Sequence, residues 1–126
     1  MLYEKPTAKT IEELEAALRE SAARHKFGVL AVLDLQKTMQ SKGVDYPRQV
    51  AVFEVCNPHQ ASRALEANPA VSTMLPCRIS VYEKDGRLTV ATALPASFMA
   101  MFGSPALESV GADVEFVLKA MIDEAA

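Results

Sequence analysis

The dipeptide Asp85-Gly86 restricts the fold of this chain more than any other feature of its sequence. It stands between two segments, 77–84 and 87–94, in which apolar and polar residues alternate. A two-residue Asp-Gly loop between alternating segments favours a type I′ turn. The sequence therefore predicts a tight β-hairpin at this point.

The register of the hairpin follows from its turn. Val81 is expected opposite Val90 on the apolar face, and Tyr82 opposite Thr89 on the other face. Cys77 shares the apolar face with Val81, so its side chain is expected to point into the core.

Two longer helices are predicted near the ends of the chain. Thr10 and Glu13 form a capping box, and the apolar face that follows them continues to about His25. Ser104 and Pro105 begin a last helix with a continuous apolar stripe. Further strands are expected at 1–5, 27–33 and 50–56, and shorter helices at 35–42, 58–67 and 95–103.

This order of elements predicts one α+β domain over residues 1–126. A chain of 126 residues buries a single core, and the order favours a mainly antiparallel sheet packed on one face by the two longer helices. The 27–33 segment is apolar throughout, which is typical of a strand buried on both faces.

Charge and composition argue against several kinds of partner. The 13 basic and 16 acidic residues give a net charge of -3 and form no basic stripe, so we expect no nucleic-acid partner. The uncharged stretch 88–107 is about as long as a membrane-spanning helix, but Pro95 and Pro105 interrupt it, so no membrane partner is expected. No apolar run follows the first residues, which predicts a cytoplasmic protein without a secretory signal.

Three motifs together resemble the signature of the domain of unknown function 302 family. They are Cys56-Asn57-Pro58, Leu75-Pro76-Cys77-Arg78 and the hairpin segment 81–86. The similarity begins near Phe27 and extends to about Gly103. The resemblance implies a small α+β fold with a curved sheet of five strands, and a homodimer. It implies no agreed activity, substrate or cofactor.

The two cysteines are the candidate catalytic residues. Cys56 ends a strand just ahead of a helix N-terminus, where amide dipoles would lower the pKa of a thiol. The simpler interpretation is that both cysteines pack as small apolar side chains. If the strands that carry them are antiparallel, as the resemblance implies, Cys56 and Cys77 lie at the same end of the sheet as reduced thiols.

Three polar residues are candidates for ligand binding, namely Asp34, Asn57 and His59. Asp34 and Asn57 each precede a helix and also suit an N-cap, while His59 also suits an exposed helix position. A group made of Cys56, His59 and Asp34 would provide a nucleophile, a base and an orienting acid, although no sequence spacing points to it. The sequence contains no metal-binding motif and indicates no cofactor.

Two functions fit these observations. We expect a homodimeric module that binds a small ligand, because the chain has uncharged surface to spare and no recognisable catalytic set. The alternative is a thiol-dependent enzyme or redox protein that uses Cys56, with Cys77 as its resolving partner. The surface expected to form the dimer is the segment 95–103 together with the outer hairpin residues Ser80, Tyr82, Thr89, Ala91 and Ala93.

Overall fold

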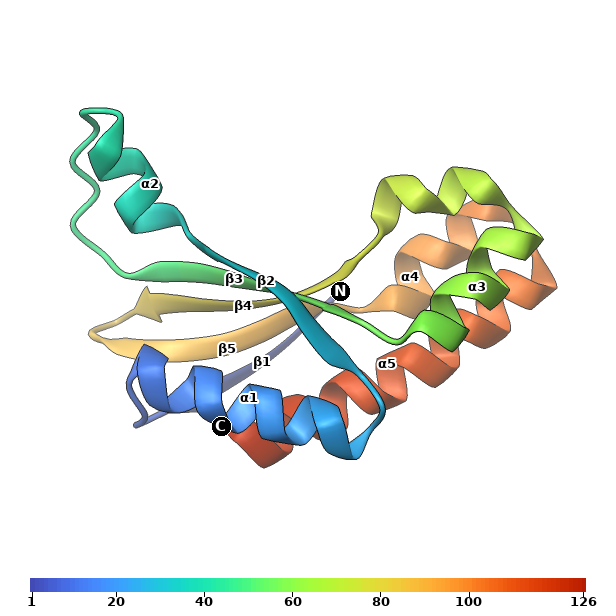
Figure 1. Ribbon diagram of the computed structural model, residues 1–126, viewed down its shortest axis with the longest axis horizontal. Helices are drawn as coiled ribbons and strands as arrows, with labels where there is room; N and C mark the ends of the chain where they lie inside the picture. The colour runs from blue at the N-terminus through green and yellow to red at the C-terminus, as the bar shows by residue number, and fades with distance from the viewer.

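A computed structural model describes residues 1–126 as a curved antiparallel sheet of five strands with its helices grouped around it (Figure 1). The strands lie in the order β1-β5-β4-β3-β2, and all neighbours pair antiparallel, which confirms the predicted α+β class. The strands are β1 (Leu2–Thr7), β2 (Gly28–Asp34), β3 (Val50–Cys56), β4 (Cys77–Lys84) and β5 (Arg87–Ala93). The helices are α1 (Ile11–Arg24), α2 (Leu35–Ser41), α3 (Pro58–Ala67), α4 (Pro95–Met99) and α5 (Pro105–Ala125), with two short 3-10 helices, η1 (Pro69–Met74) and η2 (Ala100–Phe102).

The hairpin of β4 and β5 forms in the predicted register. Val81 pairs with Val90, as the two-residue loop requires. Asp85 and Gly86 have φ values of 54° and 78°, the left-handed conformations that both central positions of a type I′ turn need. The turn therefore decides which side chains of the hairpin face the core and which face outward.

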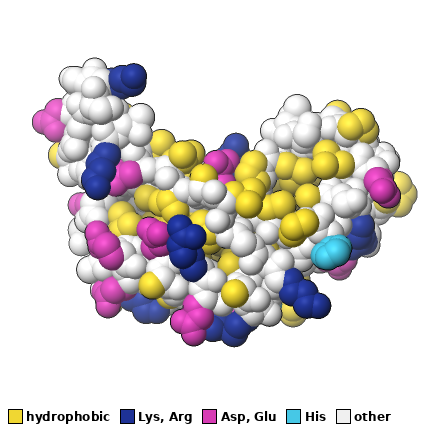
Figure 2. All heavy atoms as spheres, viewed as in Figure 1, with side chains coloured by type: hydrophobic (Ala, Val, Ile, Leu, Met, Phe, Trp, Pro, Cys, Tyr) yellow, Lys and Arg dark blue, Asp and Glu magenta, His cyan; other side chains and the backbone are white.

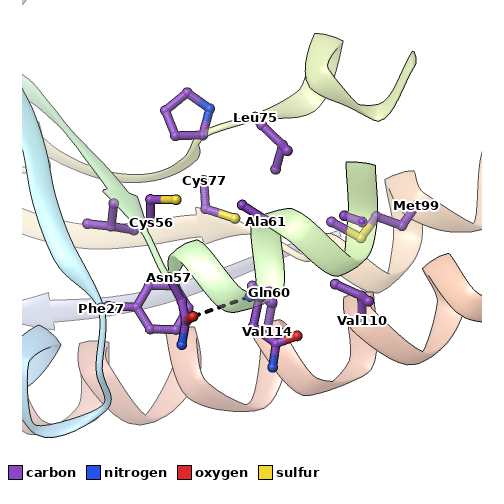
Figure 3. A pocket seen from close by; sticks show the side chains of 13 residues that line it. Phe27, Cys56, Asn57, Gln60, Ala61, Leu75, Cys77, Met99, Val110 and Val114 are labelled. Carbon is purple, nitrogen blue, oxygen red and sulfur yellow. Dashed lines mark hydrogen bonds between the residues drawn. The ribbon is translucent and has the colours of Figure 1, made fainter. Parts of the chain in front are cut away.

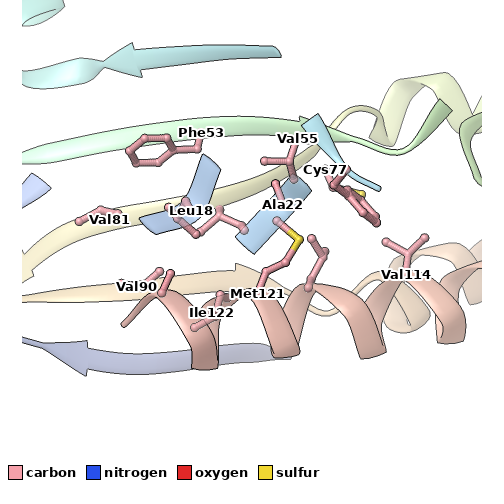
Figure 4. Packing of buried hydrophobic residues seen from close by; sticks show 14 of the residues in the cluster. Leu18, Ala22, Phe53, Val55, Cys77, Val81, Val90, Val114, Met121 and Ile122 are labelled. Carbon is pink, nitrogen blue, oxygen red and sulfur yellow. The ribbon is translucent and has the colours of Figure 1, made fainter. Parts of the chain in front are cut away.

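The hydrophobic core lies between one face of the sheet and the two longer helices (Figure 4). Alternate side chains of β3 and β4 point to this face, and α1 and α5 cover it (Figure 1). Removal of these side chains from water is the main favourable contribution to folding. Fully buried members of this layer include Leu14, Leu18, Phe53, Val55, Ile79, Val81, Val90, Leu118, Met121 and Ile122.

A glycine allows α4 to pack directly on α5. A Cβ atom on Gly111 would lie 3.1 Å from Cα of Ala96 and 3.3 Å from Sδ of Met99. Because a backbone atom is the nearest neighbour, a side chain at this position would push the two helices apart. The close contact fixes the position of α4 at one end of the sheet.

The other face of the sheet has no helix over its centre. In Figure 1, α2 rises beyond one end of this helix-free face, and η1, α3 and α4 stand at the other end. The space-filling view shows a trough between the two ends, with hydrophobic side chains along it (Figure 2). No helix of the chain combines the length and the apolar character needed to cross a membrane.

The prediction that residues 27–33 form a strand buried on both faces is wrong. Strand β2 lies at the edge of the sheet and pairs only with β3. Leu30, which lies at a shift in the register, and Leu33 expose 63% and 43% of their surface. Val29 and Val32 pack against the core, whereas the outer edge of β2 has no second strand and its exposed leucines have no covering helix within one chain.

Candidate functional site

The strands place the two cysteines at the same end of the sheet. Val55 pairs with Cys77, so Cys56 lies one residue beyond that pair. Both are free thiols, and the predicted location is confirmed because antiparallel pairing brings the end of β3 beside the start of β4. Cys77 is buried, with 9% of its surface exposed, as its hairpin register predicts.

Both thiols line a small cavity between the end of the sheet, α3 and α5 (Figure 3). Its volume is about 20 Å³, which is room for about one water molecule. Other residues around it are Phe27, Asn57, Gln60, Leu75, Met99, Val110 and Val114. A cavity of this size and composition accepts no organic ligand unless its walls move.

Burial makes both thiols poor nucleophiles. Desolvation raises the pKa of Cys56. Desolvation, together with the nearby Cys56 and against a smaller effect of Arg78, raises the pKa of Cys77 to about 11. The expectation of a lowered pKa for Cys56 is therefore wrong, because loss of solvation is the effect that decides it. At neutral pH both residues are protonated thiols.

Asn57 acts as the N-cap of α3. Its side-chain oxygen accepts hydrogen bonds from the backbone N–H groups of His59 and Gln60, at 2.9 and 3.2 Å, and Figure 3 shows the second of them. The oxygen thereby satisfies amides that a helix start leaves without a partner. Asn57 also borders the small cavity, but its oxygen is committed to the helix.

The structure does not bring Cys56, His59 and Asp34 together. Asp34 pairs with Ala51 at the far end of β3, roughly 17 Å along the strand from Cys56 at about 3.4 Å per residue. Asp34 caps α2 by accepting from the backbone N–H of Lys37 at 2.9 Å. His59 is exposed and does not line the cavity. No group of three His, Cys, Asp or Glu side chains is arranged to hold a metal ion.

A larger groove, which no motif in the sequence indicates, lies on the helix-free face. Its volume is about 290 Å³, close to the lower limit of about 300 Å³ for small-ligand sites. Strands β4, β5 and β1 contribute to it, and η1, α4 and Leu118 of α5 border it at one end. Eight of its 13 lining residues are hydrophobic. The lining includes Leu2, Met74, Pro76, Cys77, Arg78, Ser80, Tyr82, Ala91, Ala93, Pro95 and Phe98.

The polar groups of this groove come from alternate positions of β4. Arg78, Ser80 and Tyr82 lie on the helix-free face because residues two apart on a strand share a face. The hydroxyl of Tyr82 donates a hydrogen bond to Glu4 on β1. Burial and this hydrogen bond raise the pKa of Tyr82 to about 12, so Tyr82 remains a neutral hydroxyl.

The surface expected to form a dimer is exposed only in part. Thr89 and Ala91 on the outer hairpin face are buried, with 7% and 3% exposed, and Met99 is buried against α5. Met101 of the expected segment is 75% exposed, and large exposed apolar side chains also occur on β2 and on the adjoining arm, residues 35–49, which contains α2. We call this set the β2 patch: Leu30, Leu33, Leu35 and Val44.

Comparison with known proteins identifies one family. The family model described as "Domain of unknown function DUF302" matches residues 3–125. The fold is similar to the crystal structure of the uncharacterized conserved protein DUF302 from Bacillus stearothermophilus, with a TM-score of 0.94 and 32% sequence identity. That similarity covers 99% of this chain and 98% of the other. No curated protein matches the chain.

Proposed function

The chain belongs to the DUF302 family of domains of unknown function, and from that premise we propose that it is a homodimeric module that binds a small, partly apolar molecule on the helix-free face. The main observation behind the binding role is the groove of about 290 Å³. Small-ligand sites are concave and mostly apolar, with a few polar groups that fix the orientation of the ligand. The groove fits that description, because eight of its lining residues are hydrophobic and Arg78 and Ser80 add polar groups.

The groove is a better candidate than the cavity that holds the thiols. The cavity has a volume of about 20 Å³ and the groove about 290 Å³, so only the groove has room for an organic molecule. Pro76 and Cys77 line both spaces and lie between them. A ligand in the groove would therefore lie near Cys77 without needing it as a nucleophile.

The β2 patch supports a homodimer. The outer edge of β2 has unpaired backbone N–H and C=O groups, and edge strands readily pair with another chain. Helix α2 has seven residues and buries none of them, whereas isolated helices shorter than about 12 residues are marginal in water. A second copy related by a two-fold axis would cover both features at once. Strand β3 separates β2 from β4, so this contact would leave the groove accessible.

Substitution of Ala93 by leucine tests the groove. Ala93 is exposed and lines the groove, so a larger side chain would fill the groove without disturbing the core. We expect the neutral fluorophore N-phenylnaphthylamine to bind the native protein and to bind Ala93→Leu at least tenfold more weakly, which corresponds to about 1.4 kcal/mol. Ala112→Leu, on the exposed side of α5, is the matched control and should bind normally. Equal binding to both variants in a fluorescence titration would exclude the groove as the site.

A thiol-dependent activity is the second candidate, and it is supported by the position of Cys56 and Cys77 on one cavity. Two neighbouring cysteines that remain free also suit a reducing compartment such as the cytoplasm. The raised pKa values of both cysteines argue against this activity, because the thiolate is the reactive form and little of it is present at neutral pH.

The reactivity of the thiols distinguishes the two candidates. We expect iodoacetamide at pH 7 to alkylate Cys56 at least about tenfold more slowly than free cysteine, and Cys77 more slowly still, because burial raises both pKa values. The rate at Cys56 should still be rising with pH at pH 9, because burial raises the pKa of this thiol above 9 and the thiolate is the reactive form. Mass spectrometry of peptides from the digested protein measures the rate at each cysteine. Alkylation of Cys56 at pH 7 faster than that of free cysteine would favour the thiol enzyme.

A further inference from the structure

Arg78 forms no salt bridge within the chain. It is the one charged residue that lines the groove. Glu54 lies opposite Arg78 in the pairing of β3 with β4, yet Glu54 does not line the groove. The guanidinium therefore belongs to the groove and has its hydrogen-bond donors free.

Ser80 provides a second free polar group beside Arg78. The two residues share a face of β4 and lie about 7 Å apart along the strand. No side-chain hydrogen bond to another residue engages the Ser80 hydroxyl, whereas the Tyr82 hydroxyl is already bonded to Glu4. Free donors are thus concentrated at Arg78 and Ser80, and the Tyr82 hydroxyl is not among them.

The end of the groove at the start of β4 is apolar, and Arg78 lies next to it. Met74 of η1 and Phe98 of α4 line it, and Pro95 and Leu2 also belong to the lining. No acidic side chain lines the groove, although the chain as a whole has a net charge of -3. The groove therefore combines one positive charge with an apolar surface in an otherwise acidic protein.

We propose that the groove binds a small carboxylate with an apolar chain, the carboxylate on Arg78 and Ser80 and the chain toward Met74 and Phe98. The planar guanidinium presents paired N–H groups that match the two oxygens of a carboxylate. A single positive charge suits a monoanion, whereas a phosphate dianion would be left with one charge uncompensated. This inference rests on the proposed ligand-binding function and specifies the class of ligand.

Three probes separate the contribution of charge from that of the apolar chain. Hexanoate has both a carboxylate and an apolar chain, hexanol has the chain alone, and acetate has the carboxylate alone. In isothermal titration calorimetry with the full chain, we expect hexanoate to bind at least tenfold more tightly than either of the other two. Arg78→Gln should lower the affinity for hexanoate to that for hexanol, since it removes the charge from an exposed residue.

The matched control is Arg87→Gln. Arg87 is an exposed arginine of the same hairpin that does not line the groove, so its removal changes the net charge equally and should leave hexanoate binding unchanged. Equal affinities of the native protein for hexanoate and hexanol would overturn the carboxylate inference and leave the apolar groove intact. An unchanged affinity of Arg78→Gln would overturn it as well. If none of the three ligands, hexanoate, hexanol and N-phenylnaphthylamine, binds the native protein, both the proposed ligand-binding function and the carboxylate inference fail.

Discussion

Replacement of Phe53 by alanine is expected to lower the free energy of unfolding by about 3–5 kcal/mol. Phe53 has no exposed surface, and it is the largest of the fully buried side chains. Its loss removes apolar contacts and leaves a cavity between the sheet and the helices, which a packed core closes only in part. Urea unfolding followed by circular dichroism measures the change.

Val52→Ala is the matched control for this substitution. Val52 is the preceding residue of β3, but it faces the helix-free side and is only half-buried. Its replacement should lower the free energy of unfolding by about 1 kcal/mol or less, as is usual outside a packed core. If Phe53→Ala and Val52→Ala lowered the free energy of unfolding equally, the assignment of a core face and an open face to β3 would be contradicted.

Replacement of Leu33 by lysine is expected to dissociate the proposed dimer. The expected rise in the dissociation constant is at least about a hundredfold, which corresponds to about 2.8 kcal/mol. Two-fold symmetry places each substitution in the interface twice, and a lysine charge buried without a partner is strongly unfavourable. Leu33 is already 43% exposed in the single chain, so the fold itself should be unaffected. Sedimentation equilibrium of the native protein and the variant at tens of micromolar protein measures the effect.

Phe116→Lys provides the control for the dimer surface. Phe116 is 76% exposed on α5 and lies outside the β2 patch, so this variant makes the same chemical change on another surface. It should keep the mass of the native dimer. A monomeric native protein would contradict the proposed dimer, and dissociation by Phe116→Lys but not by Leu33→Lys would move the interface to α5.

The features that the sequence predicted correctly are local ones. The Asp85-Gly86 turn determines the hairpin register by itself, and the capping box of Thr10 and Glu13 begins α1 as expected. The burial of β2 was predicted incorrectly because it depends on the order of strands in the sheet. An apolar run such as 27–33 has the same pattern whether a neighbouring strand comes from its own chain or from another.

The candidate site was predicted only in part, for the same reason. Antiparallel pairing of β3 and β4 was enough to place Cys56 beside Cys77. The raised pKa of Cys56 depends on residues packed around it from distant parts of the chain, which spacing alone does not reveal. The groove is also assembled from separate elements, since Met74 and Phe98 meet the outer face of β4 only in the folded chain.

Chemical-shift mapping of the backbone amides tests directly whether the helix-free face of the sheet is the binding surface. Isotopically labelled protein would be titrated with hexanoate, and the shift of each amide signal recorded by nuclear magnetic resonance. We expect the largest shifts in residues 78–82 and 91–93, which form the floor of the groove, with small shifts in β2. Shifts centred on Cys56 and Gln60 at the small cavity, or no saturable shifts at all, would contradict this expectation.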